Sequence, residues 1–171
     1  KVVEMLMFQN LEVKNIDVED YYYQNQEIFT SPESLNISHI LICHEESERC
    51  VSNLTKTEAK AKADMIIGLI DDDNFGDLAI EYSNEPAAQV TLGNLGWVNR
   101  DIPFDQTFLN ASFALKEEEV SKPVETVFGY HIIKLFEIRP KEIIGLDVVY
   151  DSIEQTLISD LQSVAYLTYM D

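Results

Sequence analysis

Apolar and polar residues alternate along the chain with the periods of strands and helices, and these periods define the predicted elements. Residues 37–43 are predicted to form a strand with two apolar faces, because alternate side chains of a strand point to opposite sides. A short strand is predicted over residues 94–98. Residues 123–126 and 130–138 are predicted to form a hairpin around Gly129. Since the strand at 37–43 is apolar on both faces, we expect both to be covered.

Helices are predicted where apolar residues recur every three or four positions. The predicted helices cover residues 17–29, 59–70, 75–82, 104–115 and 146–170. Asp17 is the expected N-cap of the first, and Thr55 to Glu58 form a capping box before the second. Residues 83–92 contain Pro86 and no periodicity, which predicts a surface loop.

The two ends of the chain carry apolar segments that need partners. Lys1 to Phe8 is predicted to be a strand that is too apolar to stand alone in water. One stripe of the last helix holds Leu146, Val149, Tyr150, Ile153, Leu157, Leu161, Val164 and Ala165. Each larger aliphatic side chain contributes about 1.5–3 kcal/mol when fully buried. We expect this helix to pack on the main domain, on the N-terminal strand and helix, or on a missing part of a longer protein.

Composition narrows the class of partner. The 171 residues carry 31 acidic and 12 basic side chains, a net charge of -19, which argues against nucleic acid and anionic membranes. A hydrophobic content of 46% indicates a globular protein with a real core. The sequence has no apolar run near the roughly 20 residues of a membrane span. Because it begins at Lys1 and not at Met, we interpret the chain as a fragment of a longer, processed protein.

Two pairs of residues are candidates for chemistry. Cys43 and Cys50 lack the companion residues of a zinc site, so a disulfide and two free thiols both remain open. His39 and His131 lie in the middle of predicted strands, on otherwise apolar faces. Taken alone, each is typical of a hydrogen-bonded core histidine. If the two strands are neighbours, the imidazoles can meet.

An ordered series of motifs runs from about residue 37 to residue 138. It comprises Ser38-His39-Ile40-Leu41-Ile42, Phe75-x-x-Leu78-Ala79, Gly93-Asn94-Leu95-Gly96-Trp97, Phe108-x-x-Ala111-x-Phe113, Val120-Ser121-x-Pro123-Val124-x-Thr126 and Phe128-Gly129-Tyr130-His131-Ile132-Ile133. This series resembles the parvulin, or PpiC-type, peptidyl-prolyl cis/trans isomerases. The flanks, with Tyr21-Tyr22-x-x-Asn25 and the long last helix, resemble those of extracytoplasmic folding factors of the PpiD, SurA and PrsA kind.

The resemblance implies an α+β fold: a small antiparallel sheet surrounded by helices, with an extra N-terminal strand and helix and a long C-terminal helix. It divides the chain into flanking residues 1–36, an isomerase domain at 37–140, and a C-terminal helix at 141–171. The implied activity is non-covalent isomerisation of Xaa-Pro bonds, which needs no cofactor and no metal. The barrier of about 18–20 kcal/mol comes from amide resonance, and a thousandfold acceleration requires only about 4 kcal/mol.

By the same resemblance, the proline ring would bind in an apolar pocket. Its members would be Leu95, Phe104 and Phe108, with Val98 nearby. Ile102 is an alternative to Phe104, because the spacing fits either residue imperfectly. Ordinary core packing is the competing role for all of them.

The resemblance also implies a polar, catalytic set beside the pocket. That set would be His39, His131, Thr126 and Glu85. For the two histidines, a buried hydrogen-bonded pair that positions the sheet is at least as reasonable as direct proton transfer. Thr126 and Glu85 also have simpler interpretations, as a hydroxyl at a strand end and a solvated loop charge.

The sequence departs from the family at three positions. Glu85 replaces the usual Asp or Cys, Asn94 replaces an Asp, and Leu92 replaces a Gly. Glu85 bears most on activity, because the longer carboxylate can fill the site or miss its partner. The alternative function is therefore a weak or inactive parvulin-fold domain that binds peptides as a chaperone module.

The charge around the first strand bears on substrate choice. Cys43, His44, Glu45, Glu46 and Glu48 stand where phosphoserine-directed parvulins carry basic residues. We therefore predict no preference for phosphorylated substrates. The expected partners are proline-containing unfolded or partly folded polypeptides, and the flanking helices are expected to contact missing parts of the parent protein or a second copy. The expected location is periplasmic or otherwise extracytoplasmic, with any membrane anchor outside this fragment.

Overall fold

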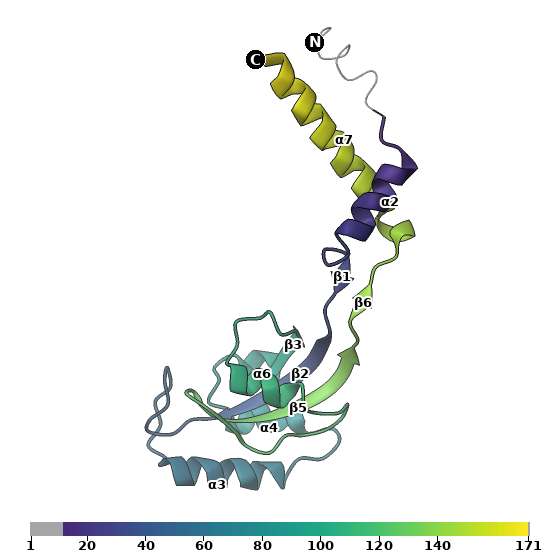
Figure 1. Cartoon of the computed structure of the whole chain (residues 1–171). Helices are drawn as coiled ribbons and strands as arrows, with labels where there is room; N and C mark the ends of the chain where they lie inside the picture. Colours follow the sequence, from purple (N-terminus) through teal and green to yellow (C-terminus); the bar gives the residue numbers. More distant parts are fainter. Residues whose placement is uncertain (1–11, 171) are drawn as a thin grey trace. The chain divides into compact units, whose positions relative to one another are not determined.

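The computed structural model describes residues 12–170 and resolves two compact units within them. One unit is residues 33–140. The other combines the flanking segment that ends at Pro32 with the segment that starts at Lys141 (Figure 1). The strand predicted over residues 1–8 lies outside the described residues.

Unit 33–140 is built on one antiparallel sheet in the order β3-β2-β5-β4. Its strands are β2 (Ser34–Ile42), β3 (Asn94–Val98), β4 (Val124–Thr126) and β5 (Gly129–Arg139). The predicted hairpin around Gly129 is confirmed, with Thr126 paired to Gly129. β2 and β5 form the centre, and their register places Leu41 opposite His131. β2 begins three residues before the predicted 37–43 and ends one residue earlier.

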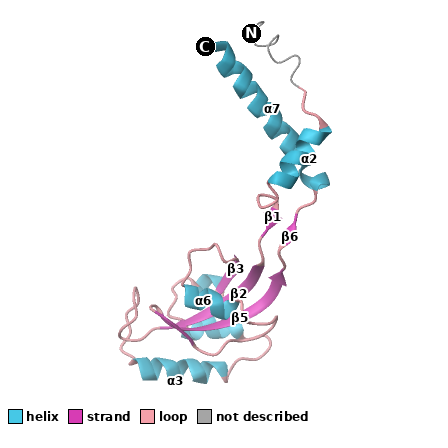
Figure 2. Ribbon diagram, in the orientation of Figure 1, coloured by secondary structure: helices cyan, strands magenta, loops and turns pink. Residues whose placement is uncertain are grey.

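Helices α3 (Lys56–Ile67) and α4 (Phe75–Tyr82) cover one face of the sheet (labelled in Figure 1 and coloured by secondary structure in Figure 2). Ile40, Ile42 and Ile132 from the strands are fully buried against these helices. The predicted capping box of α3 is present, because the Thr55 hydroxyl accepts from the Glu58 amide and the Glu58 carboxylate accepts from the Thr55 amide. This face is a largely aliphatic core that also includes Phe75 and Tyr130.

Helix α6 (Gln106–Ser112) covers the opposite face. Phe108 and Leu109 of α6 are buried in a second core that includes Ile37 and Ile133. The covering of both faces confirms the expectation drawn from the two apolar faces of β2.

Several predicted helix ends are wrong, and local hydrogen bonds explain two of them. Helix α2 (Asn15–Gln24) begins after Lys14, because Asp17 lies in its first turn and accepts a hydrogen bond from the Lys14 amide at 2.9 Å. Asp17 is therefore not the N-cap. α6 begins only after Phe104, since Asp105 is its N-cap and accepts from two amides of the first turn. α2, α3 and α6 all end before the predicted residue.

The predicted loop at 83–92 contains a short helix, α5 (Ala88–Thr91). Four residues are too few to show a helical period, so the pattern could not reveal it. α5 ends at Thr91, and its C-cap is Leu92, whose φ of 59° is left-handed. Leu92 thus occupies a position where the family's Gly is favoured, because a side chain costs about 1–2 kcal/mol in this conformation.

The second unit contains α2 and α7 (Leu146–Met170), together with the short pair β1 (Thr30–Ser31) and β6 (Glu142–Ile143). The first half of the predicted α7 stripe packs on α2, around Val18 and Ile153. Farther along the helix, Leu161 and Val164 are 40% and 62% exposed. In the described part of the chain, the helices are all too short or too polar to cross a membrane.

Candidate active site

His39 and His131 meet in the middle of the sheet. Their Nδ1 atoms are 3.2 Å apart and their rings stack with centroids 5.4 Å apart. Both side chains are only 6% exposed. The edge-to-face ring of Phe108 contacts both, at centroid distances of 5.8 Å and 5.1 Å. The predicted neighbouring of the two imidazoles is therefore present.

Thr126 extends this pair into a short chain of hydrogen bonds. Its Oγ1 lies 2.8 Å from Nε2 of His131 and also accepts from the Phe128 amide at 3.1 Å. Two neutral proton arrangements satisfy the chain. Either Thr126 donates to His131 and His131 donates to His39, or both donations run the other way. In both cases each imidazole carries one proton.

Burial keeps both histidines neutral at physiological pH. It lowers the pKa of His39 to about 4. Burial, and secondarily the nearby His39, lower the pKa of His131 to about 3, with Asp105 acting weakly in the opposite direction. A neutral pair can hold a fixed hydrogen-bond pattern but supplies no imidazolium acid at pH 7.

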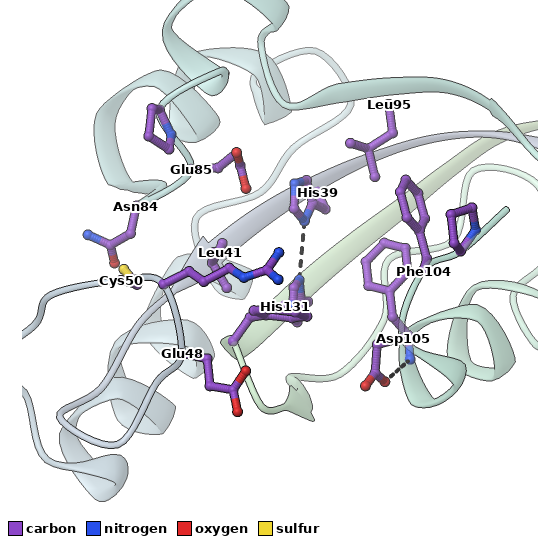
Figure 3. A pocket seen from close by; sticks show the side chains of 15 residues that line it. His39, Leu41, Glu48, Cys50, Asn84, Glu85, Leu95, Phe104, Asp105 and His131 are labelled. Atoms are coloured by element: carbon purple, nitrogen blue, oxygen red, sulfur yellow. Dashed lines mark hydrogen bonds between the residues drawn. The ribbon is translucent and has the colours of Figure 1, made fainter.

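A pocket of about 540 Å³ opens above the pair (Figure 3). Its lining combines apolar and charged residues: His39, Leu41, Glu48, Arg49, Cys50, Asn84, Glu85, Pro86, Leu95, Pro103, Phe104, Asp105, Phe108, Phe128 and His131. Figure 3 shows Glu85 on one side of His39, and Phe104 with Asp105 on the other. An apolar cleft with a few converging polar groups is the usual form of a ligand site.

The loop that carries Glu85 is fixed to the edge of β2. Where β3 leaves that edge, the Ser83 hydroxyl accepts from the Leu41 amide and the Asn84 side chain accepts from the Cys43 amide. The Asn84 amide in turn donates to the Leu41 carbonyl at 2.7 Å. These bonds place Glu85 at the pocket. Because the segment has no helical or strand periodicity, its position could not be predicted from the sequence pattern.

Glycine is required where the next loop crosses β2. Gly93 has a φ of +76°, and a Cβ there would lie 2.5 Å from the His39 carbonyl oxygen. The Gly93 carbonyl accepts from the His39 amide at 2.9 Å. Asn94 stands where the family usually has Asp. Its side-chain oxygen accepts a hydrogen bond from the Gly96 amide at 2.8 Å, which stabilises the turn between these residues.

Most predicted site residues are brought together, and two have other positions. Leu95, Phe104 and Phe108 line the pocket. Val98 does not line it, because it is fully buried in the core beside α6. Thr126 also lies outside the lining and reaches the site through His131. Ile102, the alternative to Phe104, packs on the core as well.

Several lining residues were not predicted from the sequence, among them Asp105, Arg49 and Cys50. Asp105 was hidden inside a predicted helix, although Asp is a preferred N-cap residue. Arg49 and Cys50 come to the pocket because Cys43 and Cys50 form a disulfide. That bond decides between the two states left open for these cysteines. Within residues 12–170 there is no cluster of three or more His, Cys, Asp or Glu that could hold a metal ion.

The four-stranded antiparallel sheet, its covering helices and the stacked histidine pair under an apolar pocket define a parvulin-type domain. The profile of the PPIC-type PPIase domain matches residues 21–139. The chain therefore belongs to the PpiC-type peptidyl-prolyl cis/trans isomerase family.

Individual relatives agree with this assignment. The foldase protein PrsA of Clostridium botulinum strain 657 is 35% identical over 160 residues, which are 92% of this chain and 44% of that protein. A solved structure from Campylobacter jejuni, from work on the SurA-like chaperones PEB4 and Cj1289, gives a TM-score of 0.79 at 28% identity and covers 99% of this chain and 65% of that one. The PPIase domain of TBPAR42 gives 0.55 at 26%, over 60% of this chain and 99% of that one. This chain thus spans under half the length of the PrsA relative.

Proposed function

We propose that unit 33–140 catalyses cis/trans isomerisation of Xaa-Pro bonds in unfolded or partly folded polypeptides, and so assists their folding. One observation carries this proposal. The buried pair of His39 and His131 forms the floor of a pocket whose wall is Phe104 and Phe108. The pocket is concave and apolar enough to take a proline ring, and a neutral polar network lies directly beneath it.

The chemistry requires no covalent intermediate. Twisting an Xaa-Pro amide breaks its resonance, so the nitrogen becomes a better hydrogen-bond acceptor and the carbonyl loses its fixed orientation. An apolar wall that grips the ring favours the twisted form over the planar one, which is differential binding of the transition state. Polar contacts worth about 4 kcal/mol in a pocket shielded from water are sufficient for a thousandfold acceleration.

His39, His131 and Thr126 are proposed to hold the floor of the pocket, and Leu95, Phe104 and Phe108 to bind the proline ring. Because the pKa values of both histidines are well below 7, their contribution is a fixed hydrogen-bond pattern and not proton transfer from an imidazolium. Glu85 is proposed to face the substrate, since it lines the pocket.

The charge around the pocket supports a preference for neutral or basic peptides without phosphate. Glu48, Glu85 and Asp105 line it, against the single cation Arg49. Three carboxylates around one guanidinium disfavour a dianionic phosphate next to proline. Equal turnover of serine-proline and phosphoserine-proline peptides would contradict this preference.

An extracytoplasmic location is supported by two independent features. The Cys43–Cys50 disulfide is typical of an oxidising compartment. The C. jejuni work describes Cj1289 as a periplasmic protein and both of its subjects as SurA-like chaperones.

A protease-coupled assay on Ala-Pro peptides tests the proposed activity. We expect the wild-type rate to rise linearly with protein concentration. Phe108→Ala, which removes the ring that contacts both histidines, is expected to abolish turnover, and His39→Ala to weaken it. Ala63→Gly in α3 is the matched control, because it alters the opposite face of the sheet.

A peptide-binding module without turnover is the second candidate, and Glu85 favours it. The added methylene brings a longer carboxylate into the pocket where the family has Asp or Cys. Glu85→Asp separates the two functions. Turnover that appears only in this variant, with peptide binding equal in both proteins, would identify the natural domain as a binding module.

A further inference from the structure

The loop between Cys43 and Cys50 forms part of the pocket wall. Glu48, Arg49 and Cys50 line the pocket, and Cys50 is bonded to Cys43, which is fully buried just beyond the end of β2. β2 also carries His39. The disulfide therefore links one side of the pocket covalently to the strand beneath it.

The same loop contacts the turn between β4 and β5. The Glu48 amide donates to the Val127 carbonyl at 2.8 Å, and the Arg49 guanidinium lies 5.9 Å from the centre of the Phe128 ring. Phe128 lines the pocket, and its amide donates to Thr126, which contacts His131. The loop thus supports the turn that holds the polar network.

This loop conformation needs an external constraint. Arg49 has a φ of 58°, a left-handed conformation that costs a side-chain-bearing residue about 1 kcal/mol or more. Besides the disulfide, the loop is held by local bonds, such as the Ser47 hydroxyl accepting from the His44 amide, and by two longer-range bonds, from the Glu45 amide to the Leu54 carbonyl and from the Glu48 amide to the Val127 carbonyl. Without the disulfide, relief of this left-handed φ at Arg49 would favour movement of Glu48 and Arg49 away from the pocket, against the Glu48–Val127 bond.

We propose that the Cys43–Cys50 disulfide is a positioning element of the isomerase site. It holds Glu48 and Arg49 at the pocket and supports the turn at Thr126 to Phe128, so that its reduction weakens substrate binding. This inference rests on the proposed isomerase function. In the reduction, a dithiol transfers two electrons and two protons to the disulfide, which gives two cysteine thiols, and the dithiol becomes its own cyclic disulfide.

The test compares the oxidised wild-type protein with the same protein reduced by dithiothreitol. We expect reduction to raise KM for an Ala-Pro peptide by about threefold or more and to change kcat by less than about twofold. Reoxidation with oxidised glutathione should restore KM. A thermal melt of each form confirms that the protein is folded at the assay temperature.

Variants separate positioning from general stability. Cys43→Ala with Cys50→Ala should show the raised KM with and without reductant. Arg49→Ala should raise KM in the oxidised protein and reduce the further effect of dithiothreitol. Ala63→Gly, in the core of α3, loses stability by about 1 kcal/mol but should keep the wild-type KM and its redox dependence.

Each result is decisive. Equal KM values for the oxidised and reduced protein would overturn the inference and leave the proposed function intact, as would reduction that unfolds the whole domain. If the oxidised protein shows no turnover, the proposed function fails. The inference is then tested by NMR titration with the same peptide, where equal Kd values in the two redox states would contradict it.

Discussion

The two faces of the central strands differ in what they bury. On one face, the aliphatic face, Ile132 and its neighbours pack against α3 and α4, and the polar side chains Tyr130 and Lys134 find their partners in Glu125 and Asp72. On the other, His131, the adjacent residue of the same strand, is almost as buried but contacts His39, Thr126 and Phe108. Strand alternation therefore gives each of β2 and β5 one face of ordinary core and one face that carries the candidate site.

The comparison shows how a small domain can tolerate a buried polar site. A polar group without a partner in the core costs about 1–3 kcal/mol, so His131 is acceptable only because both ring nitrogens have partners. On the aliphatic face, Tyr130 and Lys134 meet the same condition through Glu125 and Asp72, whereas Ile132 has no polar group to satisfy. Substitutions on the two faces should accordingly separate stability from turnover.

The largest expected effect is on the aliphatic face. Ile132→Ala removes a fully buried side chain and should lower the free energy of unfolding by about 2–5 kcal/mol. For the protein that remains folded, kcat/KM should stay within about twofold of wild type. Urea unfolding and the isomerase assay measure the two quantities. Ile132→Val, expected to cost about 0.5–1.5 kcal/mol, is the graded control.

Lowering the pH should destabilise the folded protein through His39 and His131. Because the folded-state pKa values are about 4 and about 3, below the unfolded value of 6.5, unfolding takes up protons as the pH falls below 6.5. The contribution of the neutral pair to stability is complete above pH 6.5 and is lost as the pH falls toward 4. We expect a slope of about 1 kcal/mol per pH unit for each histidine in this window.

Urea titrations at several pH values measure this slope. A variant with His39→Leu and His131→Leu should be flatter between pH 6.5 and 4. An unchanged slope in that variant would show that other groups titrate there.

Thr126→Val should break the hydrogen-bond chain beneath the pocket. The change leaves Nε2 of His131 without its partner and should cost about 1–3 kcal/mol of stability. A fall in kcat/KM of about tenfold is expected in the isomerase assay, because the floor of the pocket loses its fixed pattern. Thr126→Ser keeps the hydroxyl and should retain most of the activity. If Thr126→Val and Thr126→Ser have the same stability and the same kcat/KM, the hydroxyl has no role in the network.

The smallest expected effect concerns Asp105, which both caps α6 and lines the pocket. Asp105→Ala removes the cap and should cost about 1 kcal/mol in a thermal melt. Asp105→Asn keeps the cap and removes the charge, so stability should change little. Both variants should bind acidic peptides better than the wild-type protein does. If Asp105→Asn lost as much stability as Asp105→Ala, the capping role would be contradicted.

The sequence predicted the elements correctly where the periodicity of apolar residues or a capping motif specifies local structure. The alternation in β2 and β5 and the capping box at Thr55 are local signals, and the elements that they predict are present. The contact between His39 and His131 was predicted on the condition that their strands are neighbours, and β2 and β5 are paired. The family resemblance supplied the functional interpretation, since two buried histidines alone are ordinary core residues.

The features that were missed depend on contacts distant in sequence. The disulfide depends on where the chain places two sulfur atoms, so Cys43 and Cys50 could not be assigned a state, and Arg49 could not be placed at the pocket. Val98 was placed near the pocket by the family resemblance, but the packing of α6 buries it. Asp105 was hidden because apolar residues on both sides of it continue the helical period.

The central claim is that the histidine face of unit 33–140 accelerates proline isomerisation. Exchange NMR on an Ala-Pro peptide, with and without wild-type protein, measures this directly. The account predicts cis/trans exchange that quickens in proportion to protein concentration, with shifts at His39, Phe104 and Phe108. Saturating peptide binding at the same residues, with exchange no faster than in the free peptide, would contradict it.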